Sequence, residues 1–388
     1  MVMFPRISYP VAPLRAELRP LTSLRGIAAL AVIAMHFSAT MQIIARSNFP
    51  SLAPHGALAV DVFFVLSGFI MGYTYLASFR TQSLWPAYRN FLQKRAARIL
   101  PLNAAITLVL VVVAFASLWL FDFNLVPTVH PQTALVDIFS NILLLPGLGF
   151  GTSFNWPAWS ISVEFAAYFA FPLFLFLVFS RSRIVFALTC LTAIVGIYAS
   201  IGPNLNVFGL HNHPWPWRDL LRCVSEFILG LAVYRAYASG RFSNVFARDS
   251  VVLAISAVIV TIVLLNLGDL FAMLLFPALI LALSLNSGWV GTLMSSRIPY
   301  FLGTISFSLY LVTDPFRWPL QHLVKTLHPA PLHPLLAMAL AAVFTLLMIV
   351  PATISYMLIE KPSRNLLRAL IAGTSGKNRV AAPAQSGP

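Results

Sequence analysis

Charged residues are scarce in this chain. Of its 388 residues only 9% are Asp, Glu, Lys or Arg, whereas 59% are hydrophobic. An average soluble domain carries about a quarter charged residues, so there are too few here to cover the surface of a globule of this size. The scarcity excludes an ordinary soluble domain and predicts an integral membrane protein.

Acidic residues and cysteines are scarcer still. The chain has 11 Asp and Glu against 25 Lys and Arg, a net charge of +14. No basic run is interleaved with aromatic residues, so we expect no nucleic-acid partner; the excess fits basic loops beside an anionic membrane leaflet. Cys190 and Cys223 lie in apolar stretches without metal-ligand spacing. We therefore predict inert thiols and no metal site.

Long apolar runs are what the sequence has in abundance. A helix needs about 20 apolar residues to cross the hydrocarbon core. The run 136–145 is too short for this and predicts an interfacial or re-entrant helix in an external segment, 121–157. The longer runs predict an all-α, polytopic helical bundle of about ten transmembrane helices. The predicted spans are 24–44, 57–78, 98–120, 158–180, 184–201, 219–238, 250–266, 268–285, 299–318 and 334–359.

The distribution of basic residues predicts the orientation, because short loops rich in Lys and Arg stay in the cytoplasm. Most Lys and Arg fall in inner segments when both termini are cytoplasmic. We expect no cleavable signal peptide, since a polar and basic segment precedes the first span. The predicted organisation is a cytoplasmic basic segment over 1–22, a membrane domain over 23–362, and a cytoplasmic, partly disordered tail over 363–388.

Ionisable residues inside the spans are functional candidates, because burying one among lipid tails is costly. Arg25 and His36 in the first span lie eleven residues apart, which places them on nearly the same helix face about 16 Å from each other. Such a pair supplies a cation at the membrane boundary and a titratable imidazole near mid-depth. The structural alternative is a core histidine bonded to a neighbouring helix and an arginine that snorkels to headgroups.

Two later spans carry carboxylates. Asp61 in the second span either belongs to a site or pairs structurally with an arginine. In the fourth span Ser160, Glu164 and Tyr168 recur every four residues and so share one helix face. Trp159 beside them also suits an anchor at the membrane interface.

Two further spans carry arginines. Arg95 and Arg98 lie three residues apart at the inner end of the third span, where they suit either lipid headgroups or a specific anion, since guanidinium groups bind phosphate bidentately. Arg222 and Glu226, an i,i+4 pair, are expected to neutralise one another. These placements fit two functions equally well. One is a path for protons or ions, and the other is chemistry between a cytoplasmic anionic donor and an external acceptor.

The sequence resembles acyltransferase family 3, integral membrane proteins that move acyl groups, usually acetyl, onto hydroxyls of cell-surface sugars and related molecules. The resemblance runs from about Leu21 to Pro362 and depends on six elements that occur in the family's order. These are Arg25 with His36; Asp61, Phe63, Phe64, Ser67, Gly68 and Phe69; Arg95, Arg98 and Pro101; Trp159, Ser160, Glu164, Tyr168 and Pro172; Arg222, Glu226, Phe227 and Gly230; and Tyr356, Glu360 and Pro362.

The ninth span departs from the family pattern. Phe307 stands where the family has Tyr, and Thr313 stands where it usually has His. A secondary polar contact near the outer face, one that touches the acceptor, is therefore expected to differ in this protein.

The resemblance implies a membrane O-acyltransferase of the bacterial plasma membrane. Its co-substrate would be acyl-CoA, with acetyl-CoA expected, and no tightly bound cofactor is implied. The acceptor would be a carbohydrate or glycolipid: exopolysaccharide, lipopolysaccharide O-chain, a secreted oligosaccharide or a macrolide-like molecule all suit it. The implied roles are donor binding for Arg25, Arg95 and Arg98, catalysis for His36, Glu164 and Asp61, and acceptor binding for Ser160, Tyr168 and Trp159.

Two mechanistic alternatives accompany this interpretation. His36 suits a general base, with Asp61 or Glu164 orienting it. Direct transfer is expected because no serine lies in a nucleophile elbow, and a covalent acyl-histidine relay is the alternative. The competing function is a proton-coupled secondary transporter or glycolipid flippase that uses the same side chains as a proton relay, although the internal repeat of many transporters is missing.

Overall fold

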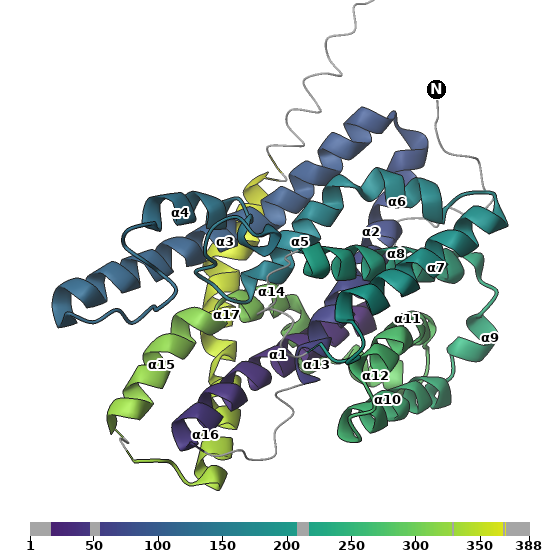
Figure 1. Cartoon of the computed structure of the whole chain (residues 1–388). Coiled ribbons are helices and arrows are strands. Elements are labelled where there is room, and N and C mark those ends of the chain that lie inside the picture. The colour runs from purple at the N-terminus through teal and green to yellow at the C-terminus, as the bar shows by residue number, and fades with distance from the viewer. Residues whose placement is uncertain (1–16, 47–54, 208–216, 328–329, 368, 370–388) are drawn as a thin grey trace, which may run out of the picture.

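The computed structural model describes residues 17–46, 55–207, 217–327, 330–367 and 369, and helices are the only regular secondary structure within these ranges (Figure 1). The all-α prediction is confirmed. In chain order the helices are α1 (Arg19–Ala45), α2 (Leu58–Thr81), α3 (Leu84–Phe121), α4 (Ala134–Ile142), η2 (Pro146–Leu148), α5 (Ala158–Phe169), α6 (Phe171–Val178), α7 (Arg183–Ile201), α8 (Trp217–Ser239), α9 (Ser243–Phe246), α10 (Asp249–Leu264), α11 (Asp269–Leu285), α12 (Trp289–Met294), α13 (Arg297–Thr304), α14 (Ser306–Leu311), α15 (Thr313–Leu327), α16 (Pro334–Leu347), α17 (Ile349–Ser355) and the π-helical turn η4 (Tyr356–Glu360).

Five helices in the described part of the chain are long and apolar enough to cross a membrane: α1, α2, α3, α7 and the continuous helix Pro334–Leu367 that contains α16, α17 and η4. The bent pair α5 and α6 makes a sixth if it is one span. Helices α10 and α11 are apolar but shorter. Every predicted span coincides with one or more of the observed helices, and the count of ten stays a prediction.

Prolines explain the bend in the fourth predicted span. Helices α5 and α6 meet at an angle of 66°. Pro172 has no N–H to donate to the carbonyl of Tyr168, four residues earlier, so the regular helix cannot continue there. The Ala170 N–H bonds instead to the Ala167 carbonyl, 3.1 Å away, which closes α5 with a tighter turn. The bend leaves the polar face of α5 at the centre of the molecule.

The ninth predicted span, 299–318, is broken into α13, α14 and α15 rather than continuous. Pro315 has no N–H for the carbonyl of Leu311, and this carbonyl accepts a hydrogen bond of 3.0 Å from the Asn155 side chain instead. The interruption therefore ties the end of α14 to the loop that precedes α5.

The backbones of α2 and α8 approach each other closely where two glycines lie at the crossing of these helices. A Cβ added at Gly68 would collide with the backbone carbonyl of Phe227, and one added at Gly230 would collide with that of Val65. Small residues at such a crossing let two membrane helices approach closely enough for van der Waals attraction to hold them together. Several residues of the candidate site lie on α2 on either side of this crossing.

We expect Gly68→Ala to destabilise the protein by about 1–3 kcal/mol, because the added methyl group meets backbone atoms that cannot move aside. Thermal unfolding in detergent should show a lower Tm. The control is Thr74→Val, a substitution on the exposed face of α2 that should leave the Tm unchanged. An unaltered Tm in Gly68→Ala would mean that α2 and α8 are not packed this closely.

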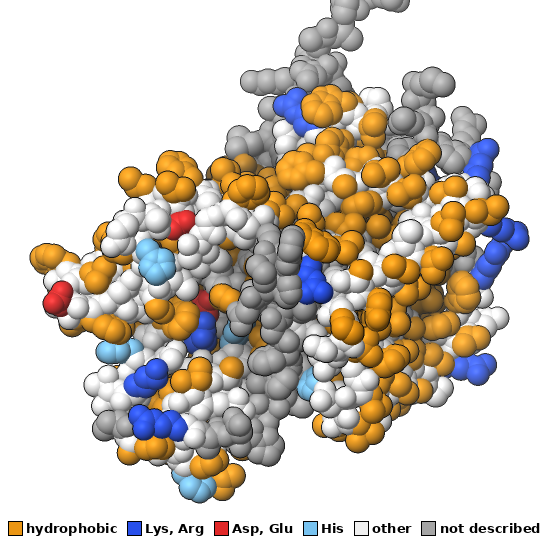
Figure 2. Space-filling model, viewed as in Figure 1, with side chains coloured by type: hydrophobic (Ala, Val, Ile, Leu, Met, Phe, Trp, Pro, Cys, Tyr) orange, Lys and Arg blue, Asp and Glu red, His pale blue; other side chains and the backbone are white. Residues whose placement is uncertain are grey.

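The molecular surface is predominantly apolar. Large hydrophobic side chains are exposed along α7 and α10, and hydrophobic side chains cover much of that face, with Lys and Arg mainly at its edges (Figure 2). An exposed apolar surface of this extent fits contact with lipid tails.

The segment 121–157 is held by buried polar side chains. The predicted interfacial or re-entrant helix corresponds to α4. Asp137 accepts from the Thr152 backbone N–H at 2.9 Å, and the Asn141 amide donates to the Thr152 carbonyl at 2.7 Å. At the other end, residues 363–367 continue the last helix, and most of the predicted N-terminal segment and of the tail lies outside the described residues.

Candidate active site

A cavity of about 100 Å³ lies where α1, α2, α3, α5 and α14 meet. Apolar side chains, among them Leu66, Ile70, Ile99 and Phe307, form much of its wall. The polar residues that line it are Arg25, Ser67, Arg95, Arg98, Ser160, Glu164, Tyr168, Ser306 and Tyr310. The cavity therefore brings together side chains that are far apart in the sequence, from Arg25 to Tyr310.

The residues on α2 give this site an axis. Phe63 packs against Tyr310 at 6.0 Å, Ser67 bonds to Glu164 one turn later, and Tyr75 receives a hydrogen bond from Arg95 two turns beyond that. Twelve helical residues cover about 18 Å. The site therefore has an arginine end, a carboxylate at its centre and a hydroxyl end.

At the arginine end three guanidinium groups converge from α1 and α3. Arg95 donates to the Tyr75 hydroxyl at 2.9 Å and lies over the Tyr75 ring. The Nε atoms of Arg25 and Arg95 are buried and have no hydrogen-bond partner among the described residues. Desolvated guanidinium groups with donors to spare are suited to bind an anion.

At the centre Glu164 accepts two hydroxyl hydrogen bonds. Ser67 of α2 donates to Oε1, and Tyr168, one turn along α5, donates to the same atom at 2.5 Å. The two hydroxyl oxygens are also 3.2 Å apart. This arrangement fixes the carboxylate of Glu164 in the cavity wall.

At the hydroxyl end the side chains of Ser160 and Tyr310 are 2.8 Å apart, and both line the cavity. Ser67, Tyr310 and Phe307 are site residues that the sequence analysis did not assign. A polar residue within an apolar span is the signal that identifies Ser67 and Tyr310. Phe307, where the family has Tyr, lies in the cavity wall, whereas Thr313 is buried and bonds to the Leu309 carbonyl of its own helix.

Asp61 lies apart from this cavity in a buried ion pair. Both its carboxylate oxygens accept from Arg222 of α8, one from Nε and one from Nη2 at 2.8 Å, and both residues are fully buried. Arg222 thus donates its hydrogen bonds across to Asp61 of α2, while the charge of Glu226, its expected partner, also attracts it. The oxygens of Glu226 have no hydrogen-bond partner among the described residues. Trp159 covers the Arg222 guanidinium at 5.9 Å.

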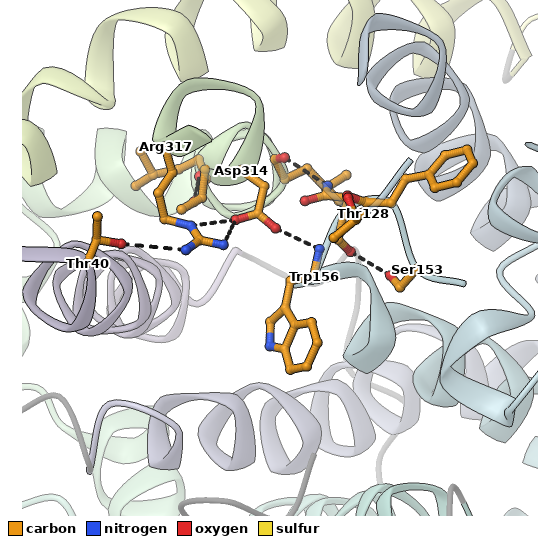
Figure 3. Close-up of polar contacts among 11 residues, drawn as sticks. Thr40, Thr128, Ser153, Trp156, Asp314 and Arg317 are labelled. Carbon is orange, nitrogen blue, oxygen red and sulfur yellow. Dashed lines mark hydrogen bonds and ion pairs between the residues drawn. The ribbon is translucent and has the colours of Figure 1, made fainter. Parts of the chain in front are cut away.

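A second polar cluster lies beyond the hydroxyl end. Asp314 accepts from the Trp156 backbone N–H and from the Arg317 side chain, each at 2.7 Å, and Arg317 donates to Thr40 of α1 at 3.5 Å. Figure 3 shows Asp314 between Arg317 and Trp156, with Thr40 on the far side of Arg317. The cluster holds α1, α15 and the loop before α5 together.

His36 lies one helical turn before Thr40 and is half-buried. It does not line the cavity. Its position eleven residues after Arg25 places it about 16 Å along α1 from that residue, one turn before Thr40, which contacts Arg317. Of the predicted site residues, the structure thus brings Arg25, Arg95, Arg98, Ser160, Glu164 and Tyr168 into one cavity, with His36, Asp61 and Trp159 outside its lining.

Apolar helices around an internal polar site define a polytopic membrane protein. A family model described as an acyltransferase domain matches residues 21–355. The chain therefore belongs to acyltransferase family 3, and it is a multi-pass membrane acyltransferase.

Two named relatives support this assignment. The acyltransferase MdmB of Streptomyces mycarofaciens is 29% identical over 325 residues, which cover 77% of this chain and 79% of that protein. The putative peptidoglycan O-acetyltransferase YrhL of Bacillus subtilis strain 168 is 26% identical over 389 residues, which cover 89% of this chain and 54% of that protein. This chain thus matches about half the length of the second relative. No solved structure matches it.

Proposed function

We propose that this protein transfers an acyl group, with acetyl expected, from cytoplasmic acyl-CoA to a hydroxyl of a cell-surface or exported carbohydrate. It would act in the bacterial plasma membrane with both termini in the cytoplasm. The observation that carries the proposal is a cavity with guanidinium groups at one end, a carboxylate at its centre and hydroxyls at the other end. The name of the second relative supports O-acetylation and adds peptidoglycan to the candidate acceptors.

In this proposal the donor lies along the axis of the cavity. Its phosphates bind Arg25, Arg95 and Arg98, because guanidinium groups match phosphate oxygens in charge and geometry. The pantetheine arm carries no charge, and it extends between apolar side chains such as Ile70 and Ile99. The thioester then reaches the level of Glu164.

The acceptor hydroxyl attacks the thioester carbonyl directly. His36 takes the proton of the hydroxyl as a general base, a role that suits neutral imidazole near pH 7. The C–S bond breaks, the ester forms, and the proton passes to the sulfur of the departing coenzyme A. The hydroxyls of Ser160 and Tyr310 supply hydrogen bonds for the acceptor.

Glu164 is the site carboxylate in this mechanism. It lines the cavity, whereas Asp61 is bound at both oxygens by Arg222. We therefore assign to Asp61 and Trp159 the positioning of α2, α5 and α8 around the cavity, and to Glu164 and Tyr168 the contact with substrate.

Coenzyme A binding tests the proposal without knowledge of the acceptor. We expect CoA or acetyl-CoA to stabilise the purified protein in detergent, by about 2.7 kcal/mol at a concentration of 100 times Kd. Arg95→Gln combined with Arg98→Gln should lower the affinity and raise the KM for acetyl-CoA more than it lowers kcat. A wild-type protein that CoA does not stabilise would instead fit a transporter or a scaffold.

The control removes the same charge from the same helix. Arg89 and Lys94 precede the cavity on α3 and do not line it. Arg89→Gln combined with Lys94→Gln should therefore leave CoA binding close to the wild-type value. An equal loss in both double variants would reduce the role of Arg95 and Arg98 to general attraction of anions.

The acceptor is identified by comparing surface carbohydrate in the presence and absence of this protein. Mass spectrometry of polysaccharide and peptidoglycan from a deletion strain should show one component that lacks an acetyl group. Its mass should be lower than in the parent strain by about 42 Da, the mass that acetylation adds to one hydroxyl. Unchanged acylation of every surface component would contradict a cell-surface acceptor.

A further inference from the structure

The helix Pro334–Leu367, the last one in the described part of the chain and called the terminal helix below, reaches the arginine end of the cavity. Glu360 closes the π-helical turn η4, is buried, and accepts a hydrogen bond of 2.7 Å from Ser308 of α14. Phe307 and Tyr310, which lie on either side of Ser308 in α14, line the cavity. Glu360 also lies close enough to Arg25 and Arg98 to attract both charges. The terminal helix is thus attached to the cavity wall at the level of Arg25.

Arg364 lies one turn beyond Glu360 on the same helix. It is half-buried, and its Nε atom is buried with no hydrogen-bond partner among the described residues. The preceding turn η4 packs against α3, the helix that carries Arg98, and the charges of Arg364 and Arg98 repel one another. Arg364 therefore joins the guanidinium groups of the arginine end, although it does not line the cavity itself.

The direction of the terminal helix places Arg364 farther out than the other arginines. This helix runs antiparallel to α1, because Phe344 packs on Phe37 at 5.9 Å while Glu360 lies near Arg25. Four residues past Glu360 correspond to about 6 Å along the helix axis. Arg364 consequently lies beyond the level of Arg25, on the side away from Ser160 and Tyr310.

The charges at this end do not balance within the protein. Among the described residues, the four guanidinium groups of Arg25, Arg95, Arg98 and Arg364 face the three carboxylates of Glu17, Glu164 and Glu360. Guanidinium groups that repel one another while partly removed from water are costly unless an anion lies between them. The Nε atoms of Arg25, Arg95 and Arg364, which have no hydrogen-bond partner in the part of the chain that the structure describes, are the donors that such an anion would use.

We infer that Arg364 is a further donor-binding residue, which binds the phosphate of acyl-CoA that lies farthest from the thioester, the 3′-phosphate of the ribose. The inference rests on the proposed function. The thioester lies toward Glu164, the pyrophosphate lies against Arg25, Arg95 and Arg98, and the ribose 3′-phosphate lies at the outermost guanidinium. Arg364 thereby distinguishes acyl-CoA from carriers that lack this phosphate.

Equilibrium binding of coenzyme A and of 3′-dephospho-coenzyme A to the full-length purified protein tests the inference. We expect the wild-type protein to bind coenzyme A about tenfold more tightly, which is the contribution of one charge-assisted hydrogen bond. Arg364→Gln should weaken coenzyme A binding by this factor, leave dephospho-coenzyme A binding unchanged, and so abolish the preference. Arg364→Lys, which keeps the charge, should retain part of it.

Lys361→Gln is the matched control. Lys361 lies one turn earlier on the same helix, carries the same charge and is exposed. Its loss should leave the preference intact. The inference is overturned if the wild-type protein binds both ligands equally, or if Arg364→Gln and Lys361→Gln behave alike. A wild-type protein that binds neither ligand would overturn the proposed function itself, which separates the two failures.

Discussion

We expect His36→Ala to lower acyl transfer by about 10²–10⁴-fold, the usual contribution of a positioned general base. His36 lies on α1 eleven residues after Arg25, outside the lining of the cavity, and one turn from Thr40 in the cluster that joins α1 to α15. Acetylation of surface carbohydrate, measured by mass spectrometry in a deletion strain that carries the variant, should fall to background. The amount of protein in the membrane should stay constant.

Ser38→Ala is the control for His36. It removes a polar group from the same helix two residues away, and we expect normal transfer from it. Residual activity of His36→Ala above about a tenth of the wild-type value would contradict the assignment of the base.

The fate of a labelled acetyl group separates direct transfer from a covalent relay. In the direct mechanism, purified wild-type protein incubated with radiolabelled acetyl-CoA and no acceptor should carry no label after denaturation. A stable label that disappears in His36→Ala would establish an acyl-histidine intermediate and overturn direct transfer.

The second large effect concerns the buried ion pair. Asp61→Leu alone or Arg222→Met alone should destabilise the protein by about 3–5 kcal/mol, because each leaves its partner buried and charged without the two hydrogen bonds of the ion pair. Thermal unfolding in detergent should show this as a markedly lower Tm. Arg241→Met removes an exposed guanidinium and should leave the Tm unchanged.

The double variant distinguishes a structural role for Asp61 from a catalytic one. Asp61→Leu combined with Arg222→Met leaves neither charge unpaired, and replacing a buried ion pair by apolar groups of similar volume is often close to neutral. We expect the double variant to be more stable than either single variant and to retain transfer activity. A double variant that is stable but inactive would indicate a catalytic role for Asp61.

The sequence by itself predicted the class of the molecule and much of its site. Scarce charge and long apolar runs determine membrane helices, because lipid offers no partner for polar groups. Helical periodicity alone placed Ser160, Glu164 and Tyr168 on one face, and all three line the cavity. These features depend only on neighbours within one helix, and local spacing therefore suffices to predict them.

The tertiary structure decided which helices face one another, and with that the role of each charge. The sequence left Asp61 open between catalysis and structure, and its partner proved to be Arg222, which is 161 positions away. Glu164 likewise accepts a hydrogen bond from Ser67, and Glu360 accepts one from Ser308, each on another helix. Pairings of this kind depend on how helices pack and where prolines such as Pro172 and Pro315 interrupt them. Packing brings together residues that no spacing within a single helix relates, and only the folded chain reveals them.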